Sequence, residues 1–184
     1  MNGEPPIFTI GHSTRPIEEF VDLLRAGPVD LVVDVRTVPR SRRNPQYNED
    51  ALPGELEPFQ IGYVRIPGLG GLRRRSNDVP PQVNGYWDNQ SFHNYADYAL
   101  SAEFAEALGQ LLDLSADRRV AIMCAEAVWW RCHRRIIADY LLERGRDVRH
   151  LMDHDRVEQA RLNPGAEPAG GTIHYPASQG DLGL

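Results

Sequence analysis

The sequence contains no lysine, so all 20 of its basic residues are arginines. Schiff-base chemistry and lysine nucleophiles both need a lysine amine, and both are therefore excluded. Every cationic contact must come from a planar guanidinium, which suits carboxylate, phosphate or sulfate groups. We attribute the absence of lysine itself to a compositional bias of the source genome.

Cysteine is also scarce, because Cys124 and Cys132 are the only two. In a cytoplasmic chain, two cysteines this close are more often metal-binding, redox-active or merely buried than a structural disulfide. The sequence also lacks any apolar run long enough to cross a bilayer. Its first residues have neither the basic segment nor the apolar stretch of a signal peptide. We therefore expect a cytoplasmic protein with no membrane partner.

The length of 184 residues and the 41% hydrophobic content predict one globular domain, residues 1–184. Short apolar runs predict strands at 7–10, 31–35, 63–66, 120–123 and 148–152. Helical spacing of apolar residues predicts helices from 17 to near Gly27-Pro28, from 102 to 114 and from 136 to Gly145, with a weaker candidate at 48–59. Alternation of strands and helices predicts an α/β fold with a central, mostly parallel sheet flanked by helices on both faces.

The remaining segments read as loops. Residues 39–45 are polar and broken by prolines, and residues 67–92 form a long irregular insert, which is often functional in a compact domain. Beyond His154 the chain is polar, with a short edge strand expected at 172–175 and a tail at 177–184.

Three predicted strands end in chemically active residues: His12, Asp34 with Arg36, and Cys124. Open α/β sheets bind ligands beyond the carboxyl ends of their strands. We therefore expect these residues to meet at one edge of the sheet.

Several stretches together resemble the domain of unknown function 488 family over about residues 7–176. They are Thr9-Ile-Gly-His-Ser13, Val33-Asp-Val-Arg36, Pro39-Arg-Ser-Arg-Arg-Asn-Pro45, Gly68-Leu-Gly-Gly-Leu72 and Met123-Cys-Ala-Glu-Ala-Val-Trp-Trp-Arg-Cys-His-Arg134. The resemblance implies a fold but no established reaction. The order of elements around Asp34 and Cys124 also resembles rhodanese-like sulfurtransferases, although the interval Cys124-x6-Arg131 is longer than their loop, so this is an analogy only.

Cys124 is the candidate nucleophile. A cysteine between a strand end and a helix N-terminus lies near unpaired N–H groups, which lower its thiol pKa, and Arg131 and Arg134 add positive charge. The loop that follows contains no glycine, however, and Glu126 places negative charge where an anion would bind. The competing interpretation is a small buried residue at a strand end.

Cys132 and His133 are expected in the first turn of the following helix. Cys132 would then serve as a resolving thiol for Cys124. Zinc binding by both cysteines with His133 and His12 or His154 is a weaker alternative, because the spacing fits no standard motif. We predict no metal, and the sequence identifies no cofactor. His133 is equally consistent with simple helix packing.

Near the other strand ends, His12 is a candidate general acid or base. Asp34 and Arg36 are interpreted as a polar pair at the strand end or, slightly favoured, as a structural salt bridge. Arginines in loops suit phosphate-bearing ligands, and aromatic side chains offer stacking surfaces. These are Arg40, Arg42, Arg43, Arg73, Arg74 and Arg75, with Trp87, Phe92, Trp129 and Trp130.

Two hypotheses follow. The first is a thiol-dependent enzyme that uses Cys124 in sulfur transfer, phosphate-type chemistry or redox exchange with Cys132. The second is a non-catalytic module that binds an anionic or phosphorylated small ligand, or nucleic acid, through the arginine-rich loops. The net charge of −6 disfavours nucleic acid.

Overall fold

The computed structural model describes residues 3–153 and 156–177, so most of the expected tail at 177–184 lies outside the described residues, as does His154. The main sheet has six strands in the order β3-β2-β4-β1-β5-β6. Five are parallel, and β6 pairs with β5 in the antiparallel direction. The strands are β1 (Ile7–Gly11), β2 (Leu31–Asp34), β3 (Gly62–Arg65), β4 (Val120–Cys124), β5 (Val148–Met152) and β6 (Arg156–Gln159).

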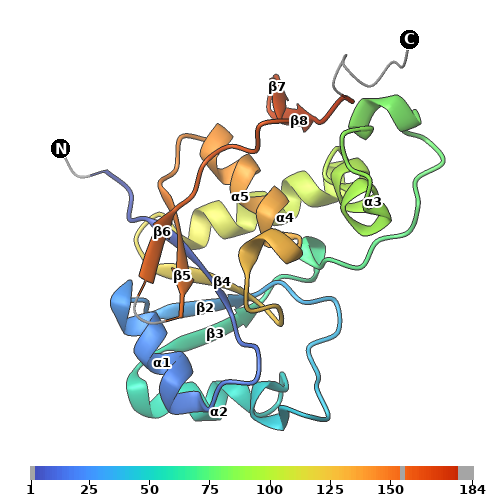
Figure 1. Cartoon of the computed structure of the whole chain (residues 1–184). Helices are drawn as coiled ribbons and strands as arrows, with labels where there is room; N and C mark the ends of the chain where they lie inside the picture. The colour runs from blue at the N-terminus through green and yellow to red at the C-terminus, as the bar shows by residue number, and fades with distance from the viewer. Residues whose placement is uncertain (1–2, 154–155, 178–184) are drawn as a thin grey trace.

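Helices cover both faces of this sheet (Figure 1). The α-helices are α1 (Ile17–Ala26), α2 (Leu52–Leu56), α3 (Gln90–Tyr98), α4 (Ala102–Leu114) and α5 (Arg134–Glu143). The short 3-10 helices are η1 (Pro45–Tyr47), η2 (Glu57–Phe59), η3 (Pro67–Leu69), η4 (Pro81–Asn84) and η5 (Trp129–Arg131). The α/β class, the mostly parallel sheet and the helices on both faces are thereby confirmed.

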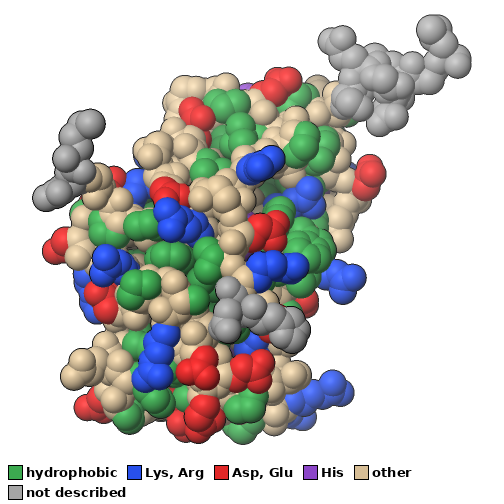
Figure 2. Space-filling view, turned by 60° about the vertical axis from the view of Figure 1, so that its left-hand side comes forward, with side chains coloured by type: hydrophobic (Ala, Val, Ile, Leu, Met, Phe, Trp, Pro, Cys, Tyr) green, Lys and Arg blue, Asp and Glu red, His purple; other side chains and the backbone are tan. Residues whose placement is uncertain are grey.

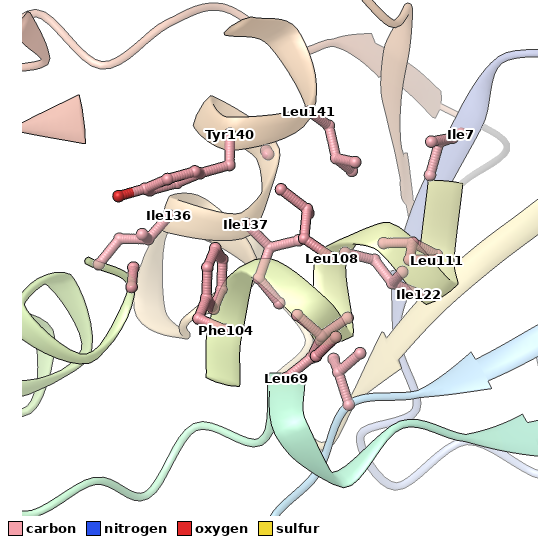
Figure 3. Packing of buried hydrophobic residues seen from close by; sticks show 14 of the residues in the cluster. Ile7, Leu69, Phe104, Leu108, Leu111, Ile122, Ile136, Ile137, Tyr140 and Leu141 are labelled. Carbon is pink, nitrogen blue, oxygen red and sulfur yellow. The ribbon is translucent and has the colours of Figure 1, made fainter. Parts of the chain in front are cut away.

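Each face of the sheet carries its own hydrophobic cluster. Residues of α1 and α2 pack on one face with Phe8, Ile10 and Val32. On the other face, residues of α3, α4 and α5 pack against Ile7 and Ile122, as Figure 3 shows. Because β1, β2 and β4 lie between these layers, every one of their residues is buried, which explains their nearly continuous apolar sequences.

Local signals set the helix ends. The Ser101 hydroxyl accepts a hydrogen bond from the Phe104 N–H at the start of α4. Gly145, with φ of +78°, follows α5 in the left-handed conformation expected of a glycine at this position. Asn89 caps α3 by accepting from the N–H groups of Ser91 and Phe92.

Three elements differ from the sequence predictions. The α3 helix was not predicted, because its cap, Asn89, falls within the irregular insert expected at 67–92. The helix predicted at 48–59 is reduced to α2 followed by η2, since its prolines interrupt the chain. The strand predicted at 172–175 is β8 (Thr172–His174), which pairs with β7 (Glu167–Ala169) in a separate ribbon, and the edge of the main sheet is β6 instead.

None of the helices formed by residues 3–153 and 156–177 has the length and apolar character to cross a membrane. On the face seen in Figure 2, basic and acidic side chains are interspersed among apolar ones. This face therefore presents a mixed charge rather than a field of one sign.

Removing side-chain volume from the cluster formed with α3, α4 and α5 should lower the free energy of unfolding. Leu108 of α4 is 1% exposed within it, whereas Leu72 is 69% exposed. We expect Leu108→Ala to lower the free energy of unfolding by about 2–5 kcal/mol, because it leaves a void among close-packed side chains. Leu72→Ala, the matched control, should change it by less than about 0.5 kcal/mol. Denaturant unfolding measures both, and equal effects would contradict the packing described above.

Candidate functional site

The carboxyl ends of the central strands converge where β4 lies between β1 and β2. Cys124, the last residue of β4, is in register with Gly11 of β1. The chain continues through a loop and η5 to Cys132, and α5 begins at Arg134. The predicted site segment 124–134 is thus a strand-loop-helix unit at the edge where open α/β sheets bind ligands.

The two cysteines face one another. Their Sγ atoms lie 2.9 Å apart as free cysteines that share a hydrogen bond. Both are buried, with Cys124 3% and Cys132 8% exposed. Two sulfurs this close in a site of low polarity favour a single shared proton, that is, one thiol and one thiolate.

Arg134 lies against this pair. Its side chain is fully buried, and its Nε donates to Cys124 Sγ at 3.0 Å and to Cys132 Sγ at 3.2 Å. Nη1 donates to the hydroxyl of Thr9 at 2.9 Å, and Nη2 donates to the carbonyl of Glu126 at 2.7 Å. A buried guanidinium without an anion is strongly unfavourable, so this arrangement requires a negative charge on the sulfur pair.

That charge belongs mainly to Cys132. Burial alone would raise the pKa of its thiol, but the hydrogen bond from Cys124, the charge of Arg134 and the Arg134 backbone N–H together lower that pKa to about 6. This N–H, in the first turn of α5, donates to Cys132 Sγ at 3.3 Å. For Cys124, burial and the hydrogen bond to Cys132 raise the pKa well above its ordinary value.

The sequence led us to expect the helix end beside Cys124. The loop and η5 separate Cys124 from α5, so the first N–H of the helix reaches Cys132 instead. Cys132 and His133 also lie just before the helix rather than within its first turn. Cys132, just before the helix, is therefore the cysteine nearest the positive end of the α5 dipole.

A cavity of about 360 Å³ gives access to the sulfurs. This volume is within the range of small-molecule sites. Its lining comes from the ends of β2 and β4, the segment after η3, the start of α3 and η5. The lining residues are Arg36, Thr37, Val38, Gly71, Leu72, Asn89, Ser91, Phe92, Cys124, Ala125, Glu126, Arg131, Cys132 and His133.

His133 is part of this cavity and was not among the predicted site residues. Its Nε2–H donates to the carbonyl of Val35 at 2.6 Å, which leaves Nδ1 as the unprotonated nitrogen. Burial lowers the pKa of His133, so the ring is neutral near pH 7. A Cβ built on Gly71 would lie 2.5 Å from Nδ1, so glycine at this position leaves the ring its space. Its position directly after Cys132 was the available signal.

His12, Asp34 and Arg36 form a hydrogen-bonded cluster of which Arg36 lines the cavity. Arg36 binds both carboxylate oxygens of Asp34, at 2.9 and 2.7 Å, which is the salt bridge favoured from the sequence. His12 donates from Nδ1 to the carbonyl of Ser13, and its Nε2 accepts from Arg36 Nη1 at 3.3 Å. Burial lowers the pKa of His12 to about 4. Asp34 and His12 do not line the cavity, and their hydrogen bonds hold the Arg36 guanidinium in place.

Only some of the predicted ligand-binding residues line the cavity. Arg131 and Glu126 line the cavity, and Arg134 lies beneath the sulfurs rather than facing a ligand. Trp130 is 41% exposed but is not part of the lining. The loop residues Arg40, Arg42 and Arg43 are not part of the lining either.

Of the other predicted binding groups, Arg73 and Trp87 serve the fold. Arg73 lies over the ring of Tyr98 and donates to the carbonyls of Pro67 and Gly70. Trp87 is buried in the core. Only Phe92, of the aromatic residues proposed for stacking, reaches the cavity.

Two more residues support Arg134 and were missed. The Thr9 hydroxyl, which accepts from Arg134 Nη1, also shares a hydrogen bond with Nδ1 of His150 at 2.7 Å. The ring of His150 stacks on Trp129 at 4.5 Å between centroids. A threonine within the apolar strand 7–11 was the signal available for Thr9, because a polar group in a buried strand needs a partner.

Across residues 3–153 and 156–177, no three His, Cys, Asp or Glu side chains are grouped as a metal site requires. His133, the weaker zinc candidate, directs Nε2 to a backbone carbonyl. His154 lies outside the described residues.

A family model described as domain of unknown function DUF488 matches residues 16–141, which is more than half of the chain. The chain belongs to the DUF488 family. The match includes Cys124, Cys132 and Arg134 but begins after β1, so it is narrower than the expected 7–176. No curated protein and no solved structure matches the chain. The rhodanese-like resemblance gains no support from these comparisons.

The pKa values predict which thiol reacts. With a pKa of about 6, Cys132 is mostly thiolate at neutral pH and becomes protonated as the pH falls. We expect iodoacetamide to alkylate Cys132 in the wild type, with a rate that rises with pH and has its midpoint near pH 6. Faster labelling of Cys124 than of Cys132 in peptide mass spectra would refute the assignment.

Gly11 determines the position of the loop. A Cβ at this residue would lie 1.7 Å from the carbonyl oxygen of Glu126, which is the acceptor for Arg134 Nη2. We expect Gly11→Ala to displace this backbone, to weaken the Arg134 contacts and to raise the alkylation midpoint of Cys132. Gly109→Ala is the matched control, because a Cβ there meets nothing within 4 Å. An unchanged midpoint in Gly11→Ala would show that the loop position does not matter.

Proposed function

We propose that the protein is a thiol–disulfide exchange enzyme in which Cys132 is the nucleophile and Cys124 the resolving thiol. The observation that carries this proposal is the hydrogen-bonded sulfur pair, 2.9 Å apart, with Arg134 Nε donating to both atoms at the end of a cavity. Redox exchange between these cysteines was one of three chemistries that the sequence left open. The geometry favours it because sulfur transfer and phosphate chemistry need only one cysteine.

The steps follow from the charge state. The Cys132 thiolate attacks a substrate disulfide R–S–S–R′, forms the mixed disulfide Cys132–S–S–R and releases R′–S⁻, which solvent protonates. The Cys124 sulfur then attacks Cys132, forms the Cys124–Cys132 disulfide and releases R–S⁻, which takes up the Cys124 proton. The substrate is reduced to two thiols, and the enzyme dithiol is oxidised to a disulfide.

The surrounding residues have distinct tasks in this scheme. Arg134 stabilises the attacking thiolate, and Thr9 and the Glu126 carbonyl position Arg134. His133 lines the same cavity and stays neutral, so it adds no positive charge that competes with Arg134 for the thiolate. Because Arg134 stabilises the reduced state, the disulfide form should be readily reduced by external thiols. A reducing compartment agrees with the cytoplasmic location that we propose.

The alternative, a non-catalytic module for phosphorylated ligands or nucleic acid, stays a prediction. Its arginines lie away from the cavity or, for Arg73, are engaged by the fold. Under that alternative neither cysteine matters for binding, which separates the two hypotheses.

The test uses reduced protein and a small neutral disulfide, bis(2-hydroxyethyl) disulfide. The wild type should lose both thiols and form the internal disulfide. Cys124→Ser should stop at a mixed disulfide on Cys132, and Cys132→Ser, which lacks the nucleophile, should form no internal disulfide. Thiol titration and intact mass measure these products. If the wild type kept both thiols, or if Cys132→Ser matched it, the proposal would have to be abandoned.

A further inference from the structure

We propose that the substrate of this site is a small disulfide whose halves carry both a carboxylate and an ammonium group, that is, an amino-acid disulfide. This rests on the proposed function. It adds a substrate class, which is derived from the cavity wall rather than from the sulfur pair.

Access to the sulfurs limits the size of the substrate. Cys124 is 3% and Cys132 8% exposed, and both line the cavity of about 360 Å³. A disulfide on the surface of a folded protein is attached to backbone on both sides and would have to enter this space with it. A free small molecule enters without such a constraint.

Charge on the wall determines the chemistry that the cavity recognises. Arg36 is neutralised by its two bonds to Asp34, and Arg134 is occupied beneath the sulfurs. Apart from the two cysteines and the neutral His133, the ionisable residues that line the cavity are then Arg131 and Glu126. Within residues 3–153 and 156–177, neither side chain has a salt-bridge partner.

The two side chains carry opposite charges and flank the cysteines in sequence. Glu126 lies two residues after Cys124, and Arg131 directly precedes Cys132. A guanidinium binds a carboxylate in a bidentate manner, and a carboxylate binds an ammonium group. A ligand with one group of each kind satisfies both, whereas a purely anionic ligand meets repulsion from Glu126. Asn89 and Ser91 add polar groups, and Phe92 an apolar surface for the carbon chain.

The experiment compares four disulfides with the reduced enzyme under turnover by dithiothreitol. They are cystine, with both charges; dithiodipropionate, with carboxylates; cystamine, with ammonium groups; and neutral bis(2-hydroxyethyl) disulfide. We expect cystine to have the lowest KM. Arg131→Gln should raise the KM for cystine and dithiodipropionate about tenfold, and Glu126→Gln should do so for cystine and cystamine.

Matched controls carry the same changes elsewhere on the surface. Arg25→Gln is on α1, where Arg25 is 63% exposed, and Glu55→Gln is on α2. Both should leave all four KM values unchanged. Equal KM values for the four disulfides, or a cystine preference that survives Arg131→Gln, would overturn the substrate assignment while reduction of the neutral disulfide still supported the proposed function. If no disulfide were reduced, the proposed function would fail first.

Discussion

The guanidinium of Arg134 is the group around which the other site residues are arranged. It is fully buried, and its donors are satisfied by two sulfurs, one hydroxyl and one carbonyl. Since a buried cation is stable only beside an anion, the cysteine pair has to supply a negative charge. The same requirement fixes Thr9, the backbone of Glu126 and the two cysteines relative to one another, although they come from two strands and a loop.

The sheet makes this arrangement possible. The β1 and β4 strands are adjacent although more than a hundred residues separate them, and their register places Gly11 beside Cys124. Because Gly11 has no side chain, the Glu126 carbonyl can approach β1 and reach Arg134. Backbone bonds from His12 to Cys124 and from Ser13 to Ala125 extend this contact beyond the strands. The topology therefore holds the loop in place before any ligand arrives.

Much of the fold was accessible from the sequence, since buried parallel strands and amphipathic helices leave strong patterns. The position of the site could also be predicted, because Cys124, Arg36 and Arg131 follow strands or a loop at one edge. The sequence could not predict which of the two cysteines lies against the helix start. That Cys132 rather than Cys124 receives the helix N–H depends on a 3-10 turn that delays α5 until Arg134. The contacts of Thr9 and His150 join two strands, β1 and β5, to Arg134 of α5 and Trp129 of η5, and no local spacing encodes them.

The central claim is that Arg134 maintains one thiolate on the sulfur pair at neutral pH. The ultraviolet absorbance of thiolate, followed during a pH titration of the reduced protein, measures it directly. We predict that one thiolate per chain appears with a midpoint near pH 6 and that the second appears only in strongly alkaline solution. Folded Arg134→Gln, verified by circular dichroism, should lose the first step. Two thiolates that titrate together near the pKa of an ordinary cysteine, in a folded wild type, would contradict the account.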